Sequence, residues 1–67
     1  MHSTALRALY RANAKSYERT AARAESELSA LRQIARPDDK PRIDSLIELI
    51  EDARLAARDL RRILGGG

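Results

Sequence analysis

The sequence of 67 residues contains no cysteine, tryptophan or phenylalanine, and only one histidine, two prolines and three glycines. Without cysteine, the chain can form neither a disulfide nor a thiolate metal site. Without tryptophan and phenylalanine, a core must be built from aliphatic side chains and alanine. The single histidine, His2, has no second metal ligand near it in the sequence. These absences argue against the common catalytic and metal-binding arrangements.

Long apolar runs are also absent, since none approaches the roughly 20 residues that a membrane-spanning helix needs. No apolar signal segment follows Met1, so we expect no secretion by a signal peptide and a cytoplasmic location. Residues 1–23 are basic and rich in alanine, and they contain one acid, Glu18. Because this composition is similar to that of mitochondrial transit peptides, the mitochondrial matrix is the alternative location.

A regular spacing of apolar residues is the main feature that the sequence does have. The steps alternate between three and four, which places these side chains on one stripe of an α-helix. The first half carries the stripe at Tyr10, Ala14, Tyr17, Ala21, Ala24, Leu28, Leu31 and Ala35, and the second at Ile43, Leu46, Ile50, Ala53, Ala57, Leu60 and Leu64. The spacing resets only between Pro37 and Pro41. We therefore predict an all-α fold, an antiparallel two-helix hairpin similar to a coiled coil.

Residues with capping and turn preferences predict where the helices begin and end. Ser3 and Thr4 are good N-cap residues, Pro37 ends the first helix, and Pro41 suits the first turn of the second. Gly65 can adopt the left-handed conformation that often closes a helix. The predicted elements of this single domain (1–67) are a helix over 4–36, a turn over 37–40, a helix over 41–64 and a flexible glycine tail over 65–67.

The second predicted helix is apolar over an arc that one neighbouring helix cannot cover. The arc spans about 200° at 100° per residue, whereas packing against one helix needs about half of that. We therefore expect a homodimer in which two hairpins form a four-helix bundle. The residues predicted for this second interface are Ile47, Leu49, Ala56 and Ile63.

The first predicted helix is longer than the second, so its beginning should extend past the end of the hairpin. If residues whose numbers sum to about 78 face each other across the short turn, Leu64 faces Ala14. Residues 4–13 then carry three large apolar side chains without intramolecular cover, which usually marks an interaction site. The residues predicted to bind another protein are Leu6, Arg7, Leu9, Tyr10 and Arg11.

Charge is segregated along the predicted hairpin. The open end, residues 1–23 and 54–67, has a net charge of +7, and the turn end, residues 24–53, has −4. Arg7 and Arg11 would lie near the positive end of a helix dipole, so they need a compensating partner. That partner could be the acidic turn end of a second hairpin packed head to tail, or an external anion or acidic protein.

Nucleic acid is the alternative partner for the basic end. The chain resembles the dimeric RNA-binding hairpins of the Rop type in size and layout. Arg7 and Arg11 would then join a phosphate-binding patch, because clustered cations at one end attract the backbone of a nucleic acid. The further residues of this predicted anion-binding patch are Lys15, Arg54, Arg58, Arg61 and Arg62.

Leu9-Tyr10-Arg11 forms a short motif in the first predicted helix, and Arg32-Gln33-Ile34-Ala35-Arg36 lies near the end of that helix. The tripeptide resembles that of the mitochondrial LYR-motif family, which has an Arg-x-Phe-like element at the place of the second segment. Members are small, basic helical adaptors. The resemblance implies that Tyr10 and Arg11 engage acyl carrier protein and that the chain assists assembly of respiratory complexes or mitoribosomes.

Catalytic and metal-binding arrangements find little support in the sequence. It contains no Ser/His/Asp or Cys/His set and no glycine-rich phosphate loop. Glu48, Glu51 and Asp52 are close in sequence, but they lie off the apolar stripe and would face solvent. We therefore expect that the protein is not an enzyme and that it binds no cofactor, metal or small-molecule substrate. The sequence favours a protein-interaction module that acts as a small adaptor, assembly factor or inhibitor-type regulator.

Overall fold

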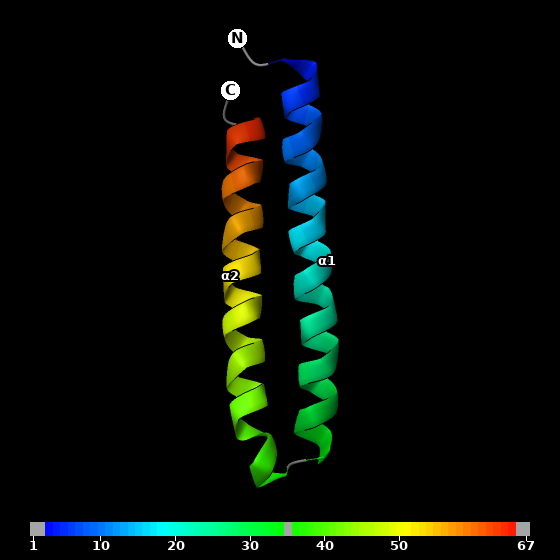
Figure 1. The fold of residues 1–67 in the computed structure, drawn as a ribbon, viewed down its shortest axis with the longest axis vertical. Helices are drawn as coiled ribbons and strands as arrows, with labels where there is room; N and C mark the ends of the chain where they lie inside the picture. The colour runs from blue at the N-terminus through cyan, green and yellow to red at the C-terminus, as the bar shows by residue number, and fades with distance from the viewer. Residues whose placement is uncertain (1–2, 35, 66–67) are drawn as a thin grey trace.

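The computed structural model describes residues 3–34 and 36–65. It contains two long helices, α1 (Thr4–Ile34) and α2 (Lys40–Gly65), joined through one short 3-10 helix, η1 (Pro37–Asp39). The two long helices run antiparallel and side by side, with α1 extending beyond the end of α2 (Figure 1). The two-helix hairpin predicted from the apolar spacing is therefore confirmed for the single chain.

Helix α1 begins with the cap that the sequence predicts. The Ser3 hydroxyl accepts a hydrogen bond from the backbone N–H of Leu6 at 3.0 Å. The Ser3 carbonyl accepts the first helical bond, from the N–H of Arg7, at 3.1 Å. Ser3 thus acts as the N-cap, because its side chain satisfies one of the donors that the first turn leaves unpaired.

The turn between the helices is compact, and its boundaries differ slightly from the prediction. Helix α1 ends at Ile34 rather than at residue 36, and Ala35 lies outside the described residues. Arg36 is extended, with φ −89° and ψ 133°, as its position before Pro37 requires. Helix α2 begins at Lys40, one residue earlier than predicted, directly after η1, which is closed by a hydrogen bond from the N–H of Lys40 to the carbonyl of Pro37.

The C-terminal end of α2 also differs from the prediction. Gly65 belongs to the helix, and its φ does not lie in the left-handed region, so it does not form the predicted left-handed cap. Gly66 and Gly67, the rest of the predicted flexible tail, lie outside the described residues.

The core is a single line of contact between α1 and α2, which we call the core seam. Its buried side chains are Ala14, Ala21, Ala24, Leu28, Leu46, Ile50, Ala53 and Ala57, and all eight belong to the predicted stripe. Among the described residues of that stripe, Tyr17 is the one that is exposed, at 43%, and the remaining members are half-buried. No polar or charged residue is buried in the described part of the chain.

The core seam is uneven along its length. Its larger side chains gather near the turn, where Leu28, Leu46 and Ile50 form one cluster with Ala24. Toward the open end the buried residues are all alanines. The molecule measures 52 × 13 × 13 Å, and its radius of gyration is 15.3 Å. A compact chain of this length would have a radius of gyration of about 11 Å, so most helical surface faces outward.

Candidate functional site

One side of the core seam is strongly charged, and we call it the charged flank. Its positions recur every seven residues along each helix, so they form a continuous row beside the core. Seven of these nine residues are charged: Arg11, Glu18, Glu25 and Arg32 of α1, and Lys40, Arg54 and Arg61 of α2, with Thr4 and Ile47 as the exceptions.

Ion pairs between the helices connect much of the charged flank. Arg61 donates two hydrogen bonds to Glu18, from Nε to Oε2 at 2.9 Å and from Nη2 to Oε1 at 2.7 Å. The bonds from Arg61 lower the pKa of the Glu18 carboxyl. One heptad further on, the guanidinium of Arg54 pairs with Glu25. Both acids of this flank are therefore paired with an arginine of α2, whereas Arg11 and Arg32 have no ion pair within the described residues.

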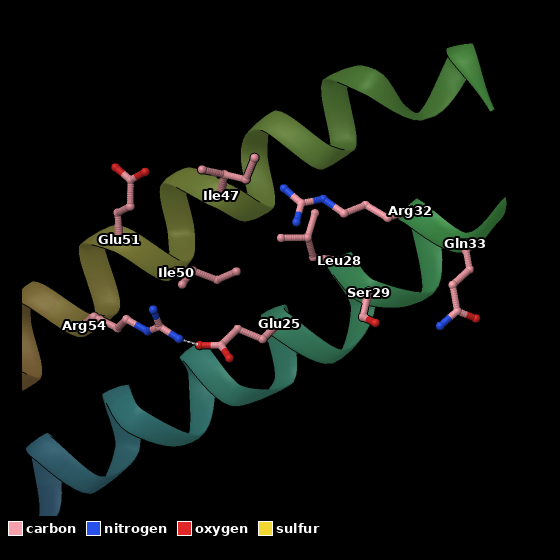
Figure 2. Close-up of a pocket in the computed structure, with 9 residues that line it drawn as sticks. All are labelled: Glu25, Leu28, Ser29, Arg32, Gln33, Ile47, Ile50, Glu51 and Arg54. Carbon is pink, nitrogen blue, oxygen red and sulfur yellow. Dashed lines mark hydrogen bonds and ion pairs between the residues drawn. The ribbon is translucent and has the colours of Figure 1, made fainter. Parts of the chain in front are cut away.

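An open groove lies at the turn end of the charged flank, with a cavity volume of about 630 Å³. Figure 2 shows Leu28 and Ile50 projecting into the space between the helices, and Ile47 also lines the groove. Arg32 reaches toward Ile47 at the position where the heptad would place the next ion pair (Figure 2). Within the described residues Arg32 has no acidic partner, so the groove combines an apolar floor with an available guanidinium.

The opposite side of the core seam carries little charge, and we call it the apolar flank. Its heptad row contains Leu6, Asn13, Thr20, Glu27 and Ile34 of α1 and Arg42, Leu49, Ala56 and Ile63 of α2. Two shallow depressions share Thr20 and Leu49, which shows that the middle of this row is continuous. Its only two charged members pair with each other, through Arg42 Nε and Glu27 Oε2 at 2.6 Å.

The ion pairs on the two flanks give the register of the helices. Paired residue numbers sum to 79 on the charged flank and 69 on the apolar flank, so residues at equal height sum to about 74. Leu64 therefore lies level with Tyr10 and not with Ala14. The predicted overhang of residues 4–13 is too long by about one helical turn.

The register explains how the predicted partner-binding residues are arranged. Leu9 is 55% exposed and Arg11 is exposed, as expected. Leu6 and Tyr10 are half-buried, so the expectation that they lack intramolecular cover is wrong. Arg7 is also half-buried, and its Nη2 donates to the carbonyl oxygen of Leu64 at 2.8 Å.

The contact of Arg7 has a physical reason that sequence reasoning missed. A cation is unfavourable at the N-terminal end of its own helix, but it is favourable at the C-terminal end of a neighbouring one. Because the hairpin is antiparallel, the beginning of α1 lies beside the end of α2 (Figure 1). Arg7 therefore finds its compensating partner within the chain, and the antiparallel layout was the signal for it.

The four residues predicted for the oligomer interface lie on two different sides. Leu49, Ala56 and Ile63 are seven residues apart and lie together on the apolar flank, where Leu49 is 44% and Ile63 is 49% exposed. Ile47 lies on the charged flank and lines its groove. The first three can form one continuous surface, and Ile47 cannot join it.

The predicted anion-binding residues do not form one patch of available cations. Arg54 and Arg61 are paired with glutamates of α1. Arg58 lies 3.9 Å from a carboxylate oxygen of its neighbour Asp59. Lys15 and Arg62 are exposed and have no ion pair within residues 3–34 and 36–65.

Sequence reasoning also missed the acids that organise the two flanks. Glu18, Glu25 and Glu27 each pair with an arginine of α2. The bond from Arg42 lowers the pKa of Glu27, as the bonds from Arg61 do for Glu18. The seven-residue spacing of Glu18 and Glu25 beside the apolar stripe was the signal that could have identified the charged flank.

Comparison with known proteins identifies no relative. No family model matches the sequence, and no curated protein or solved structure matches it. In the described part of the chain, neither helix contains a stretch long and apolar enough to cross a membrane. The same residues contain no group of three or more potential metal ligands.

Proposed function

We propose that this chain is a non-enzymatic helical hairpin that binds another protein through the apolar flank. The exposed Leu9 near the beginning of α1 extends this binding surface. The observation that carries the proposal is the unequal distribution of charge on the two sides of the core seam. Seven of nine residues are charged in one heptad row, whereas in the other row the two charged residues, out of nine, pair with each other. Exposed apolar surface of this kind is typical of a protein interface.

Protein is a better candidate than nucleic acid for a physical reason. A phosphate backbone is bound by cations that are available to it. Here two of the seven arginines and lysines predicted for that role, Arg54 and Arg61, already hydrogen-bond to carboxylates of α1. An adaptor, an assembly factor or an inhibitor-type regulator would use the apolar flank in the same way.

The test is affinity capture with the full chain as bait, in an extract of the cells that produce it. Leu49→Ser removes an apolar side chain from the apolar flank, and we expect it to reduce capture of a bound protein strongly. Leu55→Ser is the matched control, because Leu55 lies on the same helix, is 49% exposed and lies beside Glu51, Arg54 and Arg58. Equal capture by the wild type and both variants would overturn the proposal.

Two further arms of the same experiment separate the alternatives. If nuclease treatment of the extract removes the captured material, the partner is a nucleic acid and not a protein. Purified acyl carrier protein, offered directly, tests the partner implied by Leu9-Tyr10-Arg11. Its capture by the wild type, with loss in Leu9→Ser, would identify one specific protein that the hairpin binds.

A further inference from the structure

We infer that the protein covering the apolar flank is a second copy of this chain, packed head to tail to form a four-helix bundle. This inference rests on the proposed function, because it names the occupant of the same surface. Four observations carry it: the amount of exposed surface, the composition of the core, the layout of the apolar flank and the segregation of charge.

The exposed surface exceeds what a stable chain of this size normally has. The hairpin exposes 5155 Å² at a mass of 7.5 kDa. A globular monomer of that mass exposes about 4,200 Å², so about 900 Å² is in excess. A standard interface buries about 800 Å² on each partner. One additional interface of ordinary size would therefore bring the hairpin to a normal exposed area.

The composition of the core favours this additional burial. Five of the eight buried side chains are alanines, and the cluster with larger side chains occupies only the turn half. Alanine contributes little apolar area, and a small chain with one thin core is usually stabilised by association. A second copy supplies the missing apolar contact along the whole length of the molecule.

The apolar flank has the layout that a two-fold axis requires. On α2, Ala56 lies midway between Leu49 and Ile63, so a small residue separates two large ones. On α1, Leu9 and Ile34 are 55% and 54% exposed and lie near opposite ends. Their separation of 25 residues is close to seven full turns, so both face the same side. A surface with this layout can pack against its own copy in the reverse direction.

Charge determines the direction in which the two copies pack. The open end of the hairpin has a net charge of +7 and the turn end −4. A two-fold axis along the helices would place the two basic ends together, where like charges repel. An axis perpendicular to the helices places the basic end of one copy beside the acidic end of the other. In this arrangement α1 packs against α1 and α2 packs against α2.

Sedimentation equilibrium of the full chain at tens of micromolar tests the association. We expect a mass twice that of the 7.5 kDa chain for the wild type and for Leu55→Ser. The double variant Leu49→Ser/Ile63→Ser should lose most of the dimer. Circular dichroism at the same concentration, and at higher concentration, separates loss of association from loss of folding. A folded, cooperative monomer of the wild type would overturn the inference.

The direction of packing is tested by one spin-label distance. Because the chain has no cysteine, Asp38→Cys provides a single labelling site in the exposed turn. Head-to-tail packing places the two labels at opposite ends, at a separation comparable to the 52 Å length of the hairpin. Packing with both turns at one end would bring them within about two helix diameters, and this result would overturn the head-to-tail arrangement.

The results also distinguish this inference from the proposed function. The wild type could be a monomer that captures a different protein, and Leu49→Ser could lose this capture. That result would overturn the inference that the occupant is a second copy, and the proposed function would stand. A dimer that survives Leu49→Ser/Ile63→Ser unchanged would overturn both, because the apolar flank would then not be the binding surface.

Discussion

At the scale of single residues, the small size of the buried alanines determines how closely α1 and α2 approach. Ala21 is 3% exposed in the core seam, whereas its neighbour Ala22 is exposed. We predict that Ala21→Leu overpacks this contact and lowers the free energy of unfolding by about 1–3 kcal/mol. Ala22→Leu, the same change one residue away, should have little effect. Urea unfolding followed by circular dichroism measures both, and equal stability of the two variants would contradict the prediction.

The ion pairs on the flanks predict how stability depends on pH. In the folded hairpin the bonds from Arg61 lower the pKa of Glu18 below its usual 4.5, so the folded state binds this proton more weakly than the unfolded chain. The stabilisation is therefore complete above pH 4.5, and it is lost as pH falls through the lowered pKa. We expect the melting temperature of the wild type to fall over that range.

Glu18→Gln should melt below the wild type at neutral pH and approach it in acid. The matched control is Glu48→Gln, since Glu48 is exposed and has no ion pair among the described residues. Thermal melts of all three proteins at neutral and acidic pH provide the comparison. A pH-independent difference between Glu18→Gln and the wild type would show that the ion pair has no part in it.

At the scale of the elements, the beginning of α1 depends on one side chain. Ser3→Ala removes the hydroxyl that accepts from the N–H of Leu6, and we expect a loss of about 1 kcal/mol in the free energy of unfolding. Ser26→Ala, in the exposed interior of the same helix, should be neutral or slightly stabilising, because alanine has the higher helix propensity. Amide hydrogen exchange should show faster exchange at Leu6 in Ser3→Ala only.

The helices themselves could be predicted from the sequence because the spacing of three and four places all apolar residues of a stripe on one helix face. Two prolines marked the turn, and Ser3 marked the beginning of α1. The register was the weak point, because a shift of one helical turn leaves both stripes in contact. Only pairs such as Arg61 with Glu18 and Arg42 with Glu27 determine it, and their partners lie far apart in the sequence.

The candidate surface was predicted in part for the same reason. Spacing alone grouped Leu49, Ala56 and Ile63, since they recur every seven residues. Spacing did not separate them from Ile47, because a wide apolar arc on one helix does not show which of its two sides lies beside the ion pairs between the helices. The contact of Arg7 with the Leu64 carbonyl depends on the packing of two helix ends, which no local pattern encodes.

At the scale of the whole molecule, the proposed dimer should respond to salt in a direction that depends on its geometry. Head-to-tail packing brings opposite net charges together, so sodium chloride should weaken association by screening that attraction. Packing with like ends together would give the opposite sign, because screening would relieve repulsion. The dimer dissociation constant, measured by sedimentation at low and high salt, therefore shows whether the two copies pack head to tail or with like ends together. An increase of affinity with salt would contradict the head-to-tail arrangement.

The uneven core also has a consequence for the order in which the chain folds. Leu28, Leu46 and Ile50 lie in the turn half of the core seam, where the intervening loop is shorter and its closure loses less chain entropy than at the open end. The transition state for folding should therefore contain the turn half and lack the alanine-lined open half. We expect high φ-values for Leu28→Ala and Leu46→Ala and low ones for Ala14→Gly and Ala57→Gly in stopped-flow experiments. The contacts between α1 and α2 would then form first beside the turn and spread toward the open end, where the two helices would pack together last.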